Sequence, residues 1–197
     1  QGEIVDGDHL LYIIATDRKR AGRLRGGVVG TLMSNLGLEH ACGSLGIPFQ
    51  RAAVGDRHVL SMLNEQGWEL GGETSGHIIC LDRSTTGDGI IAALQVLAAM
   101  RESGKTLAEL RSGLDIYPQV MINVRMSRRF EVKESPRVQQ AIKAVEDELA
   151  DNGRVVLRAS GTEPVVRVMV EGRDAAQVER LSRSLADTVK RAAEEAA

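Results

Sequence analysis

Residues 154–171, RVVLRASGTEPVVRVMVE, hold two apolar segments separated by a short polar turn. The segments 154–158 and 165–171 both place alternate residues on opposite faces, which predicts two strands, each with one apolar face. The glycine and proline of the turn favour a hairpin connection between these strands. We therefore expect an antiparallel pair in which Arg158 leaves the first strand and Arg167 enters the second.

The turn of this hairpin carries the groups that a phosphate requires. Arg158 and Arg167 each offer a planar fork of donors, and both can flank one dianion. Ser160 and Thr162 add hydroxyl donors, and Gly161 allows backbone N–H groups to come close. The alternative is a solvated hairpin tip with surface arginines, because hairpin tips are often polar.

A second motif, GGETSGH at residues 71–77, precedes the apolar run 78–81. Its glycines permit unusual backbone angles. Glu73 can accept hydrogen bonds from sugar hydroxyls, and Ser75 can both donate and accept. His77 can carry a proton near neutral pH. By itself the motif is equally compatible with a glycine-rich turn that contains an incidental acid.

Together the two motifs resemble the phosphate-binding and sugar-binding loops of the alpha-D-phosphohexomutase family. The resemblance covers almost the whole chain in order, and it is strongest to the bacterial branch that acts on glucosamine phosphates. The further segments that carry it are VGTLMSNLGL (29–38), VGDRHV (54–59), TTGDGI (85–90) and VMVEG (168–172). Asp56 and Arg57 match a family loop that lines the cleft, although Arg57 is equally compatible with a surface position at a helix start.

The resemblance implies an enzyme that interconverts glucosamine 6-phosphate and glucosamine 1-phosphate, for amino-sugar nucleotide and cell-wall precursor synthesis. The reaction passes through a phosphoserine and a bisphosphorylated sugar, and Mg²⁺ stabilises the transferred group. The family carries its phosphoserine and magnesium loop in two earlier domains, and this sequence matches neither. We therefore expect a C-terminal fragment, inactive alone, with no catalytic residue except His77 as a candidate proton carrier. Glu73 and Ser75 would bind the sugar.

Three alternatives stay open at this stage. The complete enzyme is also compatible with phosphomannomutase or phosphoglucomutase activity, and the fragment with a non-catalytic sugar-phosphate-binding module. A basic cluster at residues 18–27 raises the third, a nucleic-acid-binding domain, but a solvated linker is the favoured reading. The acids in Asp6-Gly7-Asp8 predict a turn into a helix rather than a metal loop, since Mg²⁺ needs several oxygens in octahedral geometry.

Composition narrows the expected partners. With 27 acidic and 25 basic residues the net charge is −2, so bulk charge favours neither nucleic acid nor membrane. No apolar run approaches the roughly 20 residues of a membrane span. Cys42 and Cys80 lack metal-ligand spacing and suit buried thiols in a reducing cytoplasm. The resemblance to the family implies a hexosamine phosphate, the N-terminal domains of the same chain and, in the complete enzyme, a homodimer as a further candidate.

The rest of the pattern predicts an N-terminal remnant followed by two domains. Residues 1–22 resemble the end of a preceding metal-binding domain and its linker, with an apolar helical stripe that would be exposed. Residues 23–113 alternate strands with helices, which predicts a layered α/β/α domain that binds the sugar. In residues 114–197 the order strand–helix–strand–strand–helix predicts a smaller α+β phosphate-binding domain, with an antiparallel sheet and helices on one face.

Two helices illustrate the core that is expected. The helix over residues 88–103 repeats apolar residues at helical spacing, and those expected to be buried are Ile91, Leu94, Leu97 and Ala98. The helix that begins near Asp174 has polar residues between its apolar ones, and those expected to be buried are Val178, Leu181, Leu185 and Val189.

Overall fold

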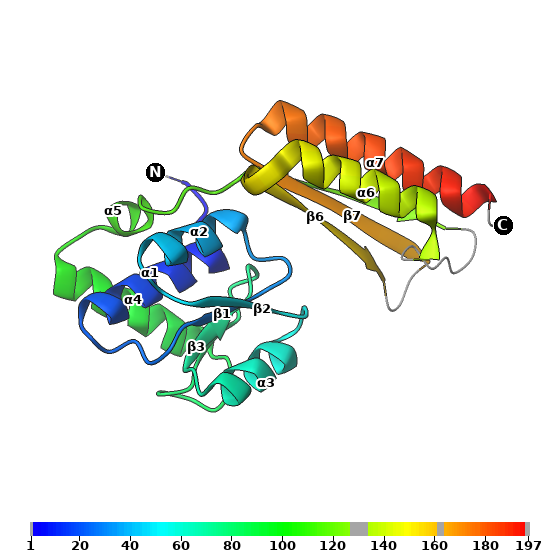
Figure 1. The fold of residues 1–197 in the computed structure, drawn as a ribbon. Coiled ribbons are helices and arrows are strands. Elements are labelled where there is room, and N and C mark those ends of the chain that lie inside the picture. The colour runs from blue at the N-terminus through cyan, green and yellow to red at the C-terminus, as the bar shows by residue number, and fades with distance from the viewer. Residues whose placement is uncertain (1, 127–133, 161–163, 196–197) are drawn as a thin grey trace. The chain divides into compact units, whose positions relative to one another are not determined.

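The computed structural model describes residues 2–126, 134–160 and 164–195, and Figure 1 shows its fold. The chain divides into two compact units, Gln1–Ile116 and Tyr117–Ala197. Each unit has its own β-sheet and its own hydrophobic core. The division falls slightly beyond the domain boundary that the sequence suggests.

The first unit is built on a four-stranded sheet in the order β2-β1-β3-β4. Its strands are β1 (Val28–Thr31), β2 (Phe49–Ala52), β3 (Leu70–Gly72) and β4 (Ile78–Cys80). Its helices are α1 (Gly7–Arg20), α2 (Leu36–Ser44), α3 (Asp56–Gln66), α4 (Gly89–Ser103) and α5 (Leu107–Arg111). Strands β2 and β3 run parallel to β1, whereas β4 pairs antiparallel with β3.

Helices cover both faces of this sheet, as the predicted α/β/α layering requires. The adjacent residues Val28 and Val29 of β1 point to opposite faces and belong to different core clusters. Val29 packs in one cluster with Val59 and Leu63 of α3. Val28 packs in the other with residues of α1, α2 and α4.

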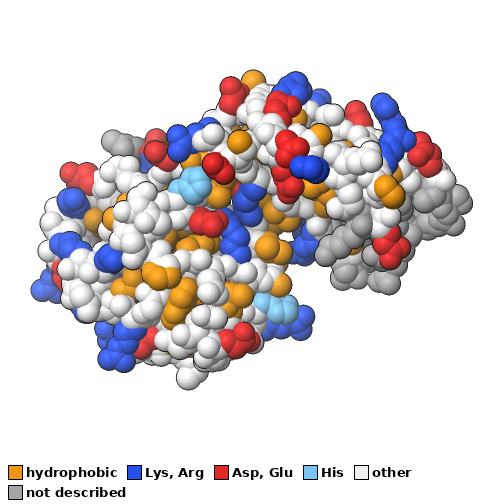
Figure 2. All heavy atoms as spheres, in the orientation of Figure 1, with side chains coloured by type: hydrophobic (Ala, Val, Ile, Leu, Met, Phe, Trp, Pro, Cys, Tyr) orange, Lys and Arg blue, Asp and Glu red, His pale blue; other side chains and the backbone are white. Residues whose placement is uncertain are grey.

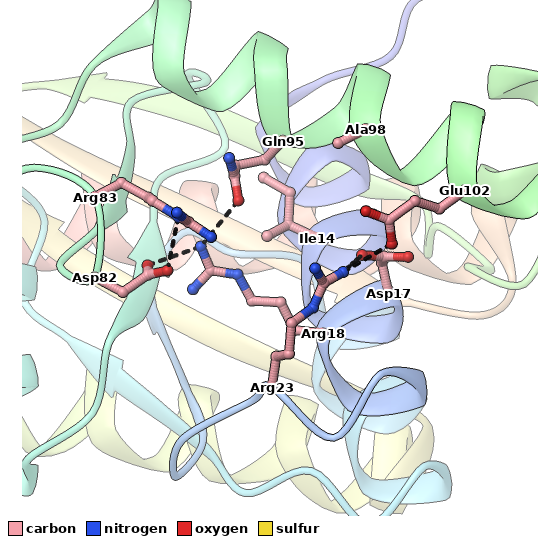
Figure 3. Close-up of a pocket in the computed structure, with 9 residues that line it drawn as sticks. All are labelled: Ile14, Asp17, Arg18, Arg23, Asp82, Arg83, Gln95, Ala98 and Glu102. Atoms are coloured by element: carbon pink, nitrogen blue, oxygen red, sulfur yellow. Dashed lines mark hydrogen bonds and ion pairs between the residues drawn. The ribbon is translucent and has the colours of Figure 1, made fainter.

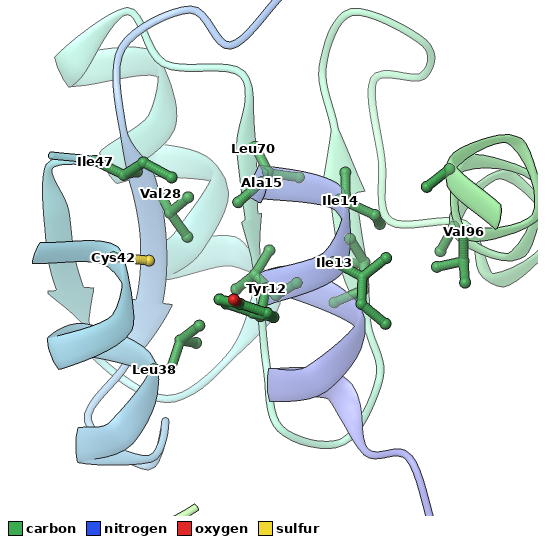
Figure 4. Close-up of a cluster of buried hydrophobic side chains, with 14 of the residues drawn as sticks. Tyr12, Ile13, Ile14, Ala15, Val28, Leu38, Cys42, Ile47, Leu70 and Val96 are labelled. Atoms are coloured by element: carbon green, nitrogen blue, oxygen red, sulfur yellow. The ribbon is translucent and has the colours of Figure 1, made fainter. Parts of the chain in front are cut away.

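Helix α1 belongs to the first unit and is not a remnant of another domain. Ile13 and Ile14 are 2% exposed and pack in one core with Leu38 of α2 and Val96 of α4, as Figure 4 shows. The prediction for residues 1–22, an exposed stripe left from a preceding domain, is therefore wrong. The partners of this stripe lie on later helices, which a local sequence pattern does not reveal.

Helix α4 turns a different face to the core from the one that its pattern suggests. Leu94 and Leu97, predicted to be buried, are 55% and 56% exposed, and Ala98 is exposed as well. The residues of α4 that are buried are Ala92, Val96 and Ala99. Because α4 is apolar nearly all round, helical spacing fits both faces, and the small alanines allow the closer packing.

The second unit is a three-stranded antiparallel sheet in the order β5-β7-β6. Its elements are β5 (Gln119–Arg125), α6 (Pro136–Leu149), the 3₁₀ turn η2 (Ala150–Asn152), β6 (Gly153–Ala159), β7 (Val165–Gly172) and α7 (Ala175–Glu195). Val166, Val168 and Val170 of β7 share a core with both helices. Figure 1 shows α6 and α7 on the same face of the sheet, which confirms the predicted α+β architecture.

Candidate functional site

The β6–β7 hairpin places two arginines directly opposite each other. Arg158 on β6 and Arg167 on β7 are partners in the strand register, and the ladder continues to Ala159 and Val166. The backbone N–H of Ser160 donates to the carbonyl of Val165 at 2.8 Å. That N–H therefore closes the hairpin and is not available to an anion.

Two residues of the predicted phosphate site, Gly161 and Thr162, lie outside the described residues. Arg158, Ser160 and Arg167 lie inside them, and all three are half-buried. Arg158 and Arg167 share the face of the sheet that points away from the valines of the core. The hairpin thus brings together the predicted phosphate ligands that the structure describes.

A second arginine on the same face of β6 has a different partner. Arg154 lies opposite Glu171 in the strand register, and its Nε donates to the Glu171 carboxylate at 2.5 Å. Glu171 is fully buried. Within the described part of the chain, neither Arg158 nor Arg167 has such a carboxylate partner. One face of this strand pair therefore holds an opposite-charge pair and a like-charge pair.

The glycine-rich motif forms the turn between β3 and β4. The N–H of Glu73 donates to the carbonyl of His77 at 3.1 Å, and the N–H of Gly76 donates to the carbonyl of Glu73 at 2.9 Å. Gly76 has φ +93°, a backbone angle that residues with a side chain rarely adopt. Ser75 is exposed at this turn, whereas Glu73 and His77 are half-buried.

Two further segments that resemble the family, 54–59 and 85–90, converge on this turn. The carboxylate of Glu73 accepts a hydrogen bond from the N–H of Gly55 at 3.0 Å. His77 Nε2 lies 3.5 Å from the carboxylate of Asp56. Gly87 packs against the same imidazole so closely that a Cβ there would lie 2.1 Å from Nε2. Sequence order alone gave no sign that these segments meet.

The hydrogen bonds of Arg57 that the structure shows do not reach the β3–β4 turn. Its N–H donates to the neighbouring Asp56 carboxylate at 2.8 Å, and its Nε lies 3.3 Å from His58 Nε2. Arg57 is exposed at the start of α3. The structure thus places it where a surface arginine of a helix start would lie, and Asp56 is the residue of this loop nearer to His77.

Asp6 and Asp8 belong to the start of α1, as predicted, and do not form a metal loop. The Asp6 carboxylate accepts the N–H of His9 at 3.1 Å and caps the helix. Asp8 accepts hydrogen bonds from the N–H of Asn35 and the hydroxyl of Thr74. In the described part of the chain, no three His, Cys, Asp or Glu side chains are grouped to hold a metal ion. These residues therefore do not fit a magnesium site.

The basic cluster at residues 18–27 is matched by acidic groups of the same unit. Arg18 is 5% exposed, and its guanidinium lies 2.9 Å from Asp82 and 3.3 Å from Gln95 (Figure 3). Arg23 forms ion pairs with carboxylates of α1 and α4. These side chains line a pocket of about 220 Å³. Most of the cluster is exposed, and residues 21–27 connect α1 to β1 as the predicted linker does. The pairing of its arginines with acidic groups disfavours the nucleic-acid alternative.

The surface charges also disfavour a nucleic-acid-binding domain, because the face shown in Figure 2 carries Lys and Arg interspersed with Asp and Glu. Among the described residues, no helix has the length and apolar composition to cross a bilayer.

Cys42 and Cys80 are free and buried, as expected. Burial, and secondarily the nearby Glu39, raises the pKa of Cys42 to about 12. This thiol is therefore unsuited to act as a nucleophile.

The chain matches two consecutive domains of one protein family. Residues 6–117 match "Phosphoglucomutase/phosphomannomutase, alpha/beta/alpha domain III". Residues 121–188 match "Phosphoglucomutase/phosphomannomutase, C-terminal domain". The chain therefore belongs to the phosphoglucomutase/phosphomannomutase family, and the resemblance to alpha-D-phosphohexomutases is confirmed.

Curated relatives within this family narrow the comparison. The phosphoglucosamine mutase of Methylobacillus flagellatus is 58% identical over 193 residues, which cover 98% of this chain and 43% of that protein. The phosphoglucosamine mutase of Nitrosococcus oceani is 59% identical over 189 residues, which cover 96% of this chain and 42% of that protein. The chain therefore spans less than half the length of these relatives.

Solved structures support the fold. The crystal structure of Aspergillus fumigatus N-acetylphosphoglucosamine mutase, in complex with GlcNAc-6P and magnesium, superposes with a TM-score of 0.81 and 23% identity. The match covers 97% of this chain and 45% of that one. A phosphoglucomutase/phosphomannomutase family protein from Burkholderia thailandensis matches with a TM-score of 0.69 and 19% identity, over 97% of this chain and 43% of that one.

Proposed function

We propose that the chain is the sugar- and phosphate-binding part of a phosphoglucosamine mutase. The complete enzyme would interconvert glucosamine 6-phosphate and glucosamine 1-phosphate through a phosphoserine and a bisphosphorylated sugar. Identities of 58% and 59% to two proteins of that name support amino-sugar phosphates over mannose or glucose phosphates. By itself the chain would bind the substrate without turnover, because the resemblance assigns the phosphoserine to an earlier domain.

The observation that carries this proposal is the register of Arg158 opposite Arg167. Like charges directly opposite each other destabilise an antiparallel pair. A dianionic phosphate between the two guanidiniums would replace this repulsion by charge-assisted hydrogen bonds, which arginine forms in a fixed planar geometry. The half-buried Ser160 hydroxyl would add a third donor from the end of β6.

The proposed role of this site is to hold the phosphate that does not react. The substrate has to bind in two opposite orientations, because each end of the sugar is phosphorylated in turn. The holding groups must therefore bind both ends equally and exchange no proton with them. Arginine meets this requirement, since its guanidinium is a donor only and stays charged at physiological pH.

The β3–β4 turn would recognise the sugar itself. Glu73 would accept hydrogen bonds from sugar hydroxyls, and the exposed Ser75 would contact them from the same turn. His77 would carry a proton to or from the reacting oxygen. The Asp56 carboxylate, 3.5 Å from His77 Nε2, would accept the ring N–H and orient the imidazole.

Magnesium would be bound in an earlier domain of the complete enzyme, as the resemblance implies, and Asp6 and Asp8 have other partners in this chain. None of the roles proposed for the residues of this chain involves the metal. The free thiols of Cys42 and Cys80 support a cytoplasmic location, since reducing compartments keep thiols unpaired. The N-terminal domains of the complete enzyme are the proposed protein partner, and a homodimer is a further proposal that analytical ultracentrifugation would test.

Calorimetric titration with glucosamine 6-phosphate tests the proposal. We expect binding to the 197-residue chain and its loss in the double variant Arg158→Ala/Arg167→Ala. The matched control is Arg183→Ala/Arg191→Ala, which removes the same charge from exposed positions of α7 and should bind normally. Equal affinity in the hairpin variant would remove the two arginines from the site. Parallel titrations with mannose and glucose phosphates would test the proposed amino-sugar preference.

A further inference from the structure

The start of α1 lies directly against the proposed sugar-binding turn. The N–H of Gly7 donates to the carbonyl of Thr74 at 2.9 Å. The Asp8 carboxylate accepts the Thr74 hydroxyl at 3.1 Å. A Cβ on Gly7 would lie 2.0 Å from the carbonyl oxygen of Glu73 and 2.6 Å from the nitrogen of Gly76. No side chain fits between the helix start and the turn.

Asp8 connects this turn to a third segment. The carboxylate oxygen that accepts the Thr74 hydroxyl also accepts the N–H of Asn35 at 2.8 Å. Asn35 is the residue that caps α2. Asp8 is 0% exposed, and these two donors stabilise one of its carboxylate oxygens near the N-terminal end of α1.

Thr74 stands between Glu73 and Ser75, the two residues proposed to contact the sugar. Anchoring both the carbonyl and the hydroxyl of Thr74 fixes the backbone on either side of it. The Glu73 carboxylate is held separately by the N–H of Gly55. The turn is therefore tied to α1 through its backbone and to the start of α3 through the side chain that would meet the substrate.

We propose that Asp8 is a positioning residue, which sets through Thr74 the direction in which Glu73 and Ser75 face the sugar. Asp8 does not touch the substrate in this scheme. The inference rests on the proposed function, because it assigns to the turn a geometry that matters for sugar binding. It extends the proposed site to the start of α1, for which the sequence pattern predicts a turn into a helix and no role in binding.

Three substitutions test this role by calorimetry with glucosamine 6-phosphate. Thr74→Val removes the hydroxyl at nearly constant volume, and we expect about tenfold weaker binding, because a turn released from this anchor has to be ordered again when the sugar binds. Thr74→Ser keeps the hydroxyl and should bind as the unsubstituted chain does. Asp8→Asn should weaken binding by a similar factor. The double variant Asp8→Asn/Thr74→Val should bind about as weakly as either single variant, because both remove the same interaction.

A ligand-free measurement makes the test independent of substrate affinity. Hydrogen exchange of the Gly76 N–H, which donates within the turn, should accelerate in Asp8→Asn and Thr74→Val but not in Thr74→Ser. The control is Asp6→Ala, which removes the cap of the same helix and lowers stability without a contact to Thr74. Unchanged binding and exchange in Thr74→Val would overturn the positioning role. Accelerated exchange without sugar-phosphate binding by any chain would overturn the proposed function alone.

Discussion

Replacing Arg158 by glutamate is expected to stabilise the protein and abolish its affinity for phosphate. The substitution turns the like-charge pair of Arg158 and Arg167 into an opposite-charge pair at the same register position. A gain in stability together with a loss of affinity is the outcome expected of a site that keeps two cations together for a ligand.

The size of the stability gain follows from the strand geometry. Cross-strand charge pairs change stability by about 0.2–1 kcal/mol, with the sign set by the charges. For a unit of this size, 1 kcal/mol corresponds to a shift in Tm of roughly 4–8 °C. Both side chains are half-buried, so solvent partly screens their charges. We therefore expect a gain in the free energy of unfolding in the lower half of the range of about 0.2–1 kcal/mol.

Arg154→Glu is the matched control, because Arg154 lies on the same face of the same strand. Here the substitution removes an ion pair and places a carboxylate opposite the fully buried Glu171. Breaking a buried pair in this way costs about 3–5 kcal/mol. The same change of residue should therefore stabilise at position 158 and strongly destabilise at position 154.

Differential scanning calorimetry is the appropriate assay, because the two units can unfold in separate transitions. Inorganic phosphate should raise the Tm of the second unit in the unsubstituted chain and leave that of Arg158→Glu unchanged. A Tm that falls in Arg158→Glu, or a phosphate effect that survives in it, would refute the reasoning. Either result would mean that Arg158 and Arg167 do not face one anion.

Other predictions concern the first unit. Burial raises the pKa of Cys42 to about 12, so its thiol should resist iodoacetamide at pH 8.5 until the protein unfolds. This raised pKa adds to the free energy of unfolding at pH values below the pKa of the thiol in the unfolded chain. The contribution is lost as the pH rises toward the pKa of the thiol in the folded chain, which urea unfolding at pH values from 8 to 10 would detect. Gly7→Ala should lower stability by about 1–3 kcal/mol in urea unfolding, because the new methyl group meets the Glu73 carbonyl. Leu94→Glu should change stability by less than about 0.5 kcal/mol, whereas Val96→Glu should unfold the unit, as circular dichroism would show.

The contrast between α7 and α4 shows what the sequence can and cannot predict. In α7 polar residues separate the apolar ones, so only one face can be buried, and the predicted Val178 and Val189 are fully buried. In α4 apolar residues occur on every side, so Leu94 and Val96 satisfy helical spacing equally well. The choice between them depends on α1, which packs against α4 and whose own partners the sequence does not identify.

The residues of the two proposed sites also differ in how far the sequence predicts them. From the sequence, Arg158 and Arg167 could be placed on the two sides of one hairpin turn, whereas their direct pairing is a matter of register that the structure supplies. Asp8 gave no comparable signal. Its partners Asn35 and Thr74 are distant in sequence and meet it only when helix α1 docks on the sheet, and an acid two residues after another near a helix start is common for capping reasons alone.

The two proposed sites are organised by opposite physical means, and this difference bears on their roles. At the β3–β4 turn, Glu73 and Thr74 are held by hydrogen bonds from the protein itself, so the sugar would meet a preformed surface that costs little entropy to organise. At the β6–β7 hairpin, Arg158 and Arg167 are partners in the strand register, and a dianionic ligand between them would relieve their mutual repulsion. A holder of this kind would bind phosphate for its charge rather than for the sugar attached to it. It could therefore accept either end of the sugar, and discrimination among sugars would come from the turn.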